Sequence, residues 1–193
     1  MKKYTFVVFA GALVCLLLAV SCNDQGKQLA TPGAENQVER GHYLVTTMGC
    51  NDCHSPKIFT DHGPEPDSNL LLSGHPSSIP VAAFDTATAK NWVLFHPMNT
   101  VAIGPWGTSF AANLTPDSTG LGGWTEAQFS LALRHGKSKG LASGRMLLPP
   151  MPWTNYAQLS DEDLHAIFSY LQSLKPVHNV VPQPIPPGPI AAK

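Results

Sequence analysis

The sequence has few cysteines, and their positions exclude two common kinds of cysteine site. Only four occur in 193 residues, and two of them, Cys15 and Cys22, lie close to the N-terminus. The other two, Cys50 and Cys53, form a single C-x-x-C pair. A zinc site would need a second pair of Cys or His at matching spacing, and a redox dithiol would need a thioredoxin-like βαβ pattern. Neither pattern is found, so the pair predicts another chemistry.

An excess of basic residues is also missing, and this excludes one class of partner. The chain has 12 Lys and Arg, of which Lys2 and Lys3 precede Cys22, so the rest carries 10 against 13 Asp and Glu, a net charge of −3. Proteins that bind nucleic acid need a basic stripe to displace counterions from the phosphates. We therefore expect no nucleic-acid partner.

The longest apolar run, residues 6–20, is shorter than the roughly 20 residues that span a membrane. It follows two lysines, which is the pattern of an export signal covering residues 1–21. The run ends in Leu-Ala-Val-Ser-Cys22, which resembles a bacterial lipobox. We therefore expect lipid attachment at Cys22 and a location on the periplasmic face of a bacterial membrane. An ordinary cleaved signal and a retained anchor helix are the alternatives.

Residues 50–54, Cys-Asn-Asp-Cys-His, match the attachment signature of a c-type haem. Two thiols three positions apart on a helical turn can each add to one of the two vinyl groups of the haem. The next residue then stands beneath the iron, so His54 is the expected proximal ligand. The signature occurs once, which predicts one covalently bound haem c at Cys50, Cys53 and His54. No cysteine is then left for a structural disulfide.

The second axial ligand decides whether such a haem carries electrons or reacts with a substrate. Met146 and Met151 flank the Leu-Leu-Pro-Pro segment before the last predicted helix. Prolines stiffen such a strap, so that a ligand on it has little entropy left to lose. We favour Met151, which stands between two prolines, and keep Met146 as the alternative.

A histidine ligand or an open distal site would give a different protein. His62, His75 and His96 lie in segments read as loops and are alternative axial ligands. Together with Glu65 they are also candidates for the distal acid–base group of a peroxidase-like or gas-binding haem protein. Nothing in their spacing singles one out.

Hydrophobic periodicity and capping signals predict three helices, over residues 36–48, 125–135 and 160–174. The second opens with a capping box and stops at a glycine. The third has three acidic residues in its first turn, where the helix dipole favours them. The first contains Gly41, which lowers helix propensity by roughly 1 kcal/mol and is tolerated where another helix approaches closely.

Three other segments have no helical pattern. Residues 55–112 are broken by prolines and glycines and predict a long irregular insertion, with a small hairpin within 91–103. Such an insertion is often functional or covers something, here a face of the haem. Residues 22–36 predict a flexible tether, and 177–193, with five prolines, an extended tail.

Several stretches taken together resemble a bacterial class I cytochrome c, and more narrowly the haem domains in cytochrome subunits of periplasmic alcohol and aldehyde dehydrogenases. The similarity spans residues 37–176, least clearly over 55–112. The stretches that carry it are Glu39–Val45, Gly49–His54, Asn113–Pro116, Trp124–Phe129, Ala132–Gly136 and Pro150–Leu164. The resemblance implies an all-α class I cytochrome c fold, with three to five helices around one haem and the terminal helices crossing at Gly41.

The resemblance also implies a function and a ligand. In that family the methionine of the Pro-Met-Pro-aromatic strap, Met151 here, is the distal ligand. The implied role is electron transfer rather than catalysis, with a dehydrogenase or a terminal oxidase as redox partner and no small-molecule substrate. The dehydrogenase subunits often carry two or three haem domains whereas this chain has one signature, which leaves the partner open. Trp106 and Trp153 are either donors to the haem propionates or ordinary core aromatics.

Overall fold

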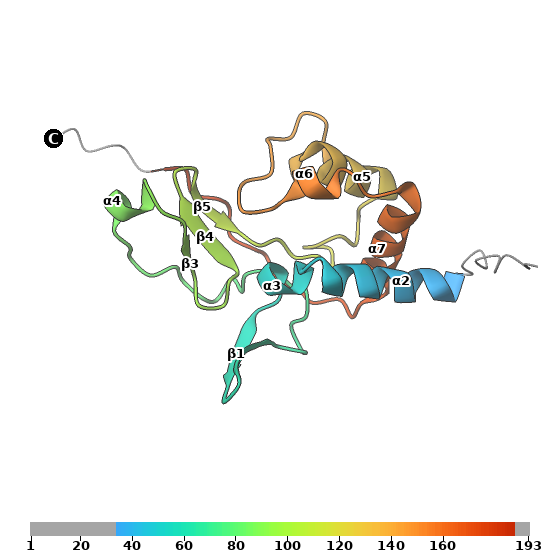
Figure 1. Ribbon diagram of the computed structural model, residues 1–193, viewed down its shortest axis with the longest axis horizontal. Coiled ribbons are helices and arrows are strands. Elements are labelled where there is room, and N and C mark those ends of the chain that lie inside the picture. The colour runs from blue at the N-terminus through green and yellow to red at the C-terminus, as the bar shows by residue number, and fades with distance from the viewer. Residues whose placement is uncertain (1–33, 188–193) are drawn as a thin grey trace, which may run out of the picture. The chain divides into compact units, whose positions relative to one another are not determined.

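The structure is a computed structural model that describes residues 34–187 (Figure 1). The predicted signal at 1–21, the lipidation site Cys22 and most of the tether lie outside the described residues. The last three tether residues, 34–36, are helical instead. Between residues 34 and 187 no helix has the length and apolar character needed to cross a membrane.

All three predicted helices are confirmed. They are α2 (Ala34–Thr47), α5 (Glu126–His135) and α7 (Asp161–Ser173). The Thr125 side chain accepts a hydrogen bond from the main chain of Gln128, whose side chain closes the capping box. Gly136 ends α5 in the left-handed conformation at φ 62°, which glycine adopts without strain.

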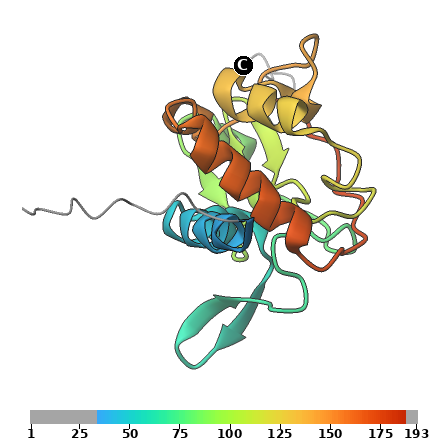
Figure 2. The same ribbon diagram turned by 90° about the vertical axis from the view of Figure 1, so that its right-hand side faces the viewer.

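Helices α2 and α7 cross in close contact, and the crossing point is Gly41, as expected (Figure 2). A Cβ atom on Gly41 would overlap the carbonyl oxygen of Ala166 and the Cβ of Tyr170. The two helices and α5 enclose the main hydrophobic core. Its buried members are Leu44, Val45, Leu72, Leu121, Phe129, Leu133, Leu164, Ala166, Ile167, Tyr170 and Leu171.

Three shorter helices complete the helical part. They are α3 (Cys50–His54), α4 (Thr86–Ala89) and α6 (Trp153–Tyr156), with one turn of 3₁₀ helix at Ser138–Gly140. The C-x-x-C-H signature therefore forms a helix of its own rather than the end of α2.

The all-α prediction is wrong in one respect, because residues 55–112 form two small antiparallel sheets. The first contains β1 (Lys57–Thr60) and β2 (Gly63–Pro66), and the second contains β3 (Leu94–Phe95), β4 (Val101–Gly104) and β5 (Gly107–Phe110). The hairpin predicted within 91–103 is confirmed, since Leu94 pairs with Ile103. The third strand of this sheet and the whole of the first sheet were not expected.

The second sheet has a small core of its own. Ala89, Val101 and Ile103 are buried there against Val81, Leu94 and Phe110. All four residues of β4 are buried, so the strand shows no alternation of apolar and polar residues.

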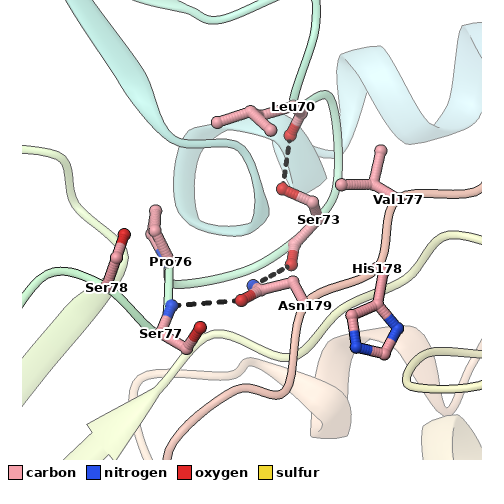
Figure 3. A pocket seen from close by; sticks show the side chains of 8 residues that line it. All are labelled: Leu70, Ser73, Pro76, Ser77, Ser78, Val177, His178 and Asn179. Carbon is pink, nitrogen blue, oxygen red and sulfur yellow. Dashed lines mark hydrogen bonds between the residues drawn. The ribbon is translucent and has the colours of Figure 1, made fainter.

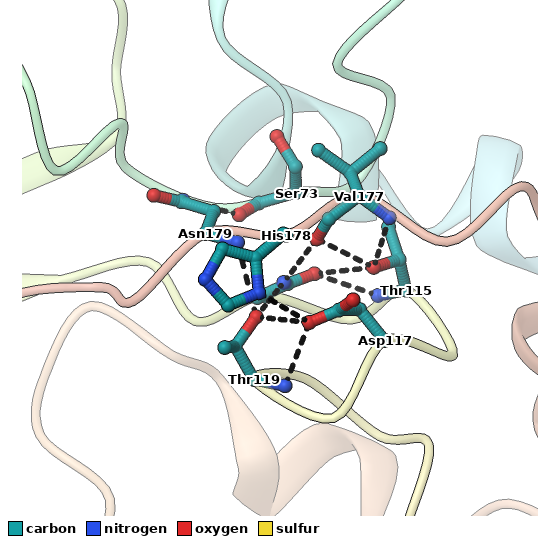
Figure 4. Close-up of polar contacts among 8 residues, drawn as sticks. Ser73, Thr115, Asp117, Thr119, Val177, His178 and Asn179 are labelled. Atoms are coloured by element: carbon teal, nitrogen blue, oxygen red, sulfur yellow. Dashed lines mark hydrogen bonds and ion pairs between the residues drawn. The ribbon is translucent and has the colours of Figure 1, made fainter.

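The tail after α7 is extended over the described residues and packs on the domain. Ile185 exchanges two main-chain hydrogen bonds with Thr108 of β5. Further back, the buried Asn179 amide donates to the carbonyl oxygens of Ser73 and His75, and its oxygen accepts from the main chain of Ser77. Figure 4 shows this seam, in which Thr115 and Thr119 also bond to the tail. The tail thus joins the insertion to the helical core.

Replacing Gly41 by alanine is expected to lower the free energy of unfolding by about 3 kcal/mol, because neither helix backbone can yield to the added methyl group. Urea unfolding followed by circular dichroism measures the change. Gly123→Ala is the matched control, since nothing lies within 4 Å of its added Cβ. Equal stabilities for the two variants would contradict the close crossing.

Replacing Asn179 by alanine is expected to lower stability by about 2 kcal/mol, because two carbonyl oxygens and one amide would lose their buried partner. The same unfolding measurement applies. Val180→Ala, at a neighbouring side chain that is 61% exposed, should change stability by less than about 0.5 kcal/mol. If Asn179→Ala proves as stable as Val180→Ala, the seam does not hold the tail.

Candidate functional site

The C-x-x-C-H helix is positioned by a glycine at one end and a lysine at the other. Gly49 has φ 72° and lets the chain turn sharply between α2 and α3. At the other end the Lys57 amine donates to the carbonyl oxygens of Asn51, Asp52 and Ser55. These oxygens belong to the last turn of α3 and the residue after it, so the amine satisfies acceptors that a helix end leaves open.

His54 is oriented by a residue far away in the sequence. Its Nδ1 lies 2.8 Å from the carbonyl oxygen of Ala112. A carbonyl can only accept, so Nδ1 carries the proton and Nε2 keeps a free lone pair. Burial lowers the pKa of His54, more than the bond to Ala112 raises it, which favours the neutral ring. A neutral imidazole held through its other nitrogen is the usual form of a metal-binding histidine.

Two extended segments bring the Ala112 carbonyl to this position. Leu114 donates to the carbonyl of Leu72, and His75 donates to that of Ala111, so that residues 72–75 run beside 111–114. The amide of Gly74 also donates to the His54 carbonyl. His54 is therefore held through both its side chain and its main chain.

The two cysteines are free and half-buried on α3. Burial raises the pKa of the Cys50 thiol to about 11, and it raises the pKa of Cys53 too. Redox-active dithiols have a lowered pKa on the attacking thiol, so the site lacks their electrostatics. Over residues 34–187 no group of three His, Cys, Asp or Glu side chains gathers as a metal site made by protein groups alone.

Asn99 connects the insertion to α3. Its amide nitrogen donates to the carbonyl oxygen of Asp52 at 3.0 Å and lies 3.6 Å from Cys53 Sγ. The residue has φ 59°, a left-handed conformation that Asn tolerates better than most residues. Asn99 closes the turn between β3 and β4, where its main-chain N–H donates to the carbonyl oxygen of His96.

The two candidate distal methionines lie in different surroundings. Met151 is half-buried and packs against the main core, as do Cys50 and Tyr156. Met146 is 43% exposed, and its methyl group lies near Gly136 and Trp153. The structure thus places Met151, and not Met146, against the core that also contacts α3.

Tyr156 ties the methionine strap to the cysteine helix. Its hydroxyl donates to the carbonyl oxygen of Met48, two residues before Cys50, at 3.1 Å. Burial raises the pKa of Tyr156 to about 12, so the hydroxyl keeps its proton and remains a donor at neutral pH.

The three-stranded sheet contacts the strap as well. Ser109 of β5 donates to the carbonyl oxygen of Pro149, two residues before Met151, at 2.7 Å. Since Asn99 of the same sheet bonds to α3, the sheet bridges the two segments that carry the candidate ligands. Neither Asn99 nor Ser109 belongs to a sequence motif, and sequence reasoning missed both.

The histidine and glutamate candidates are either exposed or hydrogen-bonded to other protein groups. His75 is fully buried, with Nδ1 on Thr100 Oγ1 and Nε2 on the Ile79 carbonyl, each at 2.9 Å. His62 is exposed in the turn between β1 and β2. Glu65 accepts from Thr60, and His96 Nδ1 accepts from the amide of Met98.

The two candidate tryptophans lie against protein groups, and two arginines near the strap also have protein partners. The Trp106 indole N–H lies 3.4 Å from Ser109 Oγ, and Trp153 lies beside Gly136. Arg134 forms an ion pair with Asp161 and donates to the carbonyl of Ala157. Arg145 donates to the carbonyl of Met146.

A small pocket opens along the tail seam, away from these residues. It is lined by Leu70, Ser73, Pro76, Ser77, Ser78, Val177, His178 and Asn179 (Figure 3). None of the predicted haem-binding residues lines it.

Comparison with known proteins decides the family. The Cytochrome c family model matches residues 38–175. This chain belongs to the cytochrome c family. The family implies a covalently bound haem c and an electron-transfer role. The residues present fit that group, because α3 offers two thiols three positions apart and His54 Nε2 keeps its lone pair for an iron.

Similar proteins include components of several bacterial dehydrogenases. The fructose dehydrogenase cytochrome subunit of Gluconobacter japonicus is 29% identical over 99% of this chain and 33% of its own length. The gluconate 2-dehydrogenase cytochrome c subunit of Pantoea cypripedii is 32% identical over 75% of this chain and 24% of its own. A nicotinate dehydrogenase subunit of Pseudomonas putida is 28% identical over 91% of this chain and 12% of its own length. The chain thus spans a third or less of the length of these relatives.

Replacing Asn99 by glycine is expected to lower the stability of the haem-loaded protein by about 1 kcal/mol, because its hydrogen bonds to α3 are lost while the left-handed backbone stays free of strain. Asn99→Ala should lose about 1 kcal/mol more through the strained φ. Urea unfolding followed at the haem absorption band compares them. An Asn99→Gly protein as stable as the wild type would show that this contact does not support α3.

Proposed function

We propose that this protein is a single-haem c-type cytochrome that carries electrons, with Cys50 and Cys53 binding the haem and His54 and Met151 as axial ligands. The observation that carries the proposal is the bond from His54 Nδ1 to the Ala112 carbonyl, which leaves Nε2 as the only ring nitrogen able to bind iron. The half-buried position of Met151 against the core supports it as the second ligand.

When bound, haem c supplies an iron that alternates between the ferrous and ferric states. The chain's contribution is to keep the ligands in place during that change, so that little reorganisation accompanies each transfer. The Ala112 carbonyl fixes the His54 ring, and the Tyr156 hydroxyl ties the strap to the chain just before α3. The sheet holds both segments from outside, through Asn99 and Ser109.

The insertion supports this role as a cover. Its three-stranded sheet spans from α3 to the strap, and the tail pairs with β5 along the edge of that sheet. A sheet in this position shields the haem from water on one side, which keeps the local dielectric low and favours a thioether ligand over water.

The partners follow from the relatives. Their names describe subunits of fructose, gluconate and nicotinate dehydrogenases. We therefore infer that a dehydrogenase donates electrons to this protein. A membrane-bound component of a respiratory chain, such as a terminal oxidase, then receives them. The predicted signal at 1–21 and lipid attachment at Cys22 support a location on the periplasmic face of a bacterial membrane.

Replacing Met151 by alanine is expected to abolish the weak charge-transfer band that methionine-ligated ferric haem shows at the red end of the visible spectrum. The reason is that no other sulfur would be left at the iron. The same variant should lower the reduction potential, because a methionine ligand favours ferrous iron.

Met146→Ala is the matched control and should keep the band, since that side chain is 43% exposed. Loss of the band in Met146→Ala alone would make Met146 the ligand. A wild-type protein without the band would contradict methionine ligation and would favour an open-site or bis-histidine haem.

A further inference from the structure

The hairpin of β1 and β2 follows α3 directly and exposes large apolar side chains. Ile58 is 48% exposed and Phe59 is 61% exposed. In both views of the ribbon the hairpin extends away from the helices (Figures 1 and 2). A two-stranded hairpin is marginally stable by itself in water, and it gains nothing from leaving such side chains in solvent. These side chains therefore need another explanation.

The two edges of the hairpin differ chemically. Pro64 pairs with Phe59 and Pro66 pairs with Lys57, and proline has no N–H, so these pairs cannot be the hydrogen-bonded ones. Bonded and non-bonded pairs alternate along an antiparallel ladder. The next pair, Pro56 with Asp67, should therefore be bonded, and the Asp67 main-chain N–H does donate to the Pro56 carbonyl oxygen at 2.8 Å. The main-chain groups of residues 57, 59, 64 and 66 consequently point outward.

This alternation closes one edge and leaves the other open. The outward positions of β2 are both prolines, which offer no donor to a neighbouring strand. The outward positions of β1 are Lys57 and Phe59, which offer N–H and C=O groups in alternation. Among residues 34–187, β1 pairs with β2 alone. One edge of the hairpin is therefore built to avoid pairing, and the other is ready to accept a strand.

A groove lies against one face of the hairpin and reaches the haem-binding helix at Asp52. It is lined by Asp52, Lys57, Pro64, Phe95, His96, Pro97 and Asn99. Lys57, Phe59 and Pro64 share one face of the hairpin, because residues two apart and cross-strand partners lie on the same side. Phe95, which is 51% exposed, forms the opposite wall. An apolar side chain of an added strand would fit between the two walls.

The charges around the hairpin indicate the kind of partner. Asp52, Asp61 and Glu65 are exposed around it, and Asp67 follows β2 half-buried. The amine of Lys57 is engaged by three carbonyl oxygens of α3 and the following residue, so it is directed away from this edge. An acidic surface attracts a basic partner and repels a second copy of itself.

We propose that the outer edge of β1 is a docking edge that accepts an extended segment, apolar on one side and flanked by basic residues, from the protein that exchanges electrons with this cytochrome. The inference rests on the proposed function. Lys57 follows His54 by three residues, a reach of at most about 11 Å of extended chain. A strand added at β1 therefore comes close to the haem attachment site.

The first experiment is site-specific photo-cross-linking in the host of the full chain. A benzoyl-phenylalanine replaces Phe59 in one strain and Val180 in another, since both side chains are 61% exposed. We expect a cross-link from position 59, and none from 180, to a separate oxidoreductase subunit identified by mass spectrometry. Equal products from both positions, no product, or a product only with a second copy or with the chain's own residues would overturn the proposal.

The second experiment compares Phe59→Pro with Phe59→Ala in binding the cross-linked protein. Both variants lose the ring, but only Phe59→Pro loses the outward N–H, and neither breaks a bond within the hairpin because the Phe59–Pro64 pair is not hydrogen-bonded. We expect Phe59→Pro to bind about tenfold more weakly than Phe59→Ala. Equal binding would show that no strand pairs at β1.

Both variants should keep the wild-type haem spectrum and be reduced by dithionite as the wild type is. This control separates the two proposals. If the wild-type protein shows the methionine charge-transfer band but position 59 gives no cross-link, only the docking edge is refuted. If the wild-type protein lacks the band, the proposed ligation is refuted.

Discussion

Helix α3 has only five residues, and a helix of that length is not stable on its own in water. Its geometry must therefore be imposed by contacts from other segments, and the proposed haem attachment depends on that geometry. Gly49 sets its direction relative to α2, and α2 is in turn fixed by its close crossing with α7 at Gly41. Lys57, Gly74 and Ala112 then hold its C-terminal end.

This dependence gives the insertion a physical purpose. Residues 72–75 and 111–114 bring the Ala112 carbonyl to His54, and the sheet between them carries Asn99 to α3 and Ser109 to the strap. The tail continues the same arrangement, because Asn179 and Ile185 bind to Ser73 and Thr108 of the insertion. The insertion and the tail act as one frame around the two segments that carry the proposed ligands.

The same frame separates two kinds of surface. One side of the insertion is engaged with the haem-binding residues, and its second sheet has a closed core. The β1–β2 hairpin, in contrast, has one edge blocked by prolines and one edge open, with Phe59 exposed beside it. Under the proposed function, a redox partner must come near the haem without displacing its ligands, and an open edge three residues from His54 meets both requirements.

Local signals in the sequence determined a large part of this protein. The spacing of Cys50, Cys53 and His54 is one such signal, and the haem attachment that it indicates stays a prediction. The capping box at Thr125 and the apolar stripe of α7 also depend on residues a few positions apart, and both are read correctly from the chain. The same holds for the glycine at position 41, because only a close crossing makes it favourable there. The small hairpin of β3 and β4 was also predicted.

Only the tertiary structure decided the rest, because it depends on contacts between distant residues. The tautomer of His54 is set by a carbonyl 58 residues away, and packing against the core is found for Met151 while Met146 stays 43% exposed. Strands β1, β2 and β5 were not predicted, because each has only four residues and none has the apolar–polar alternation that marks a strand. Asn99 and Ser109 belong to no motif, and their roles arise because folding brings the sheet against both ligand-bearing segments.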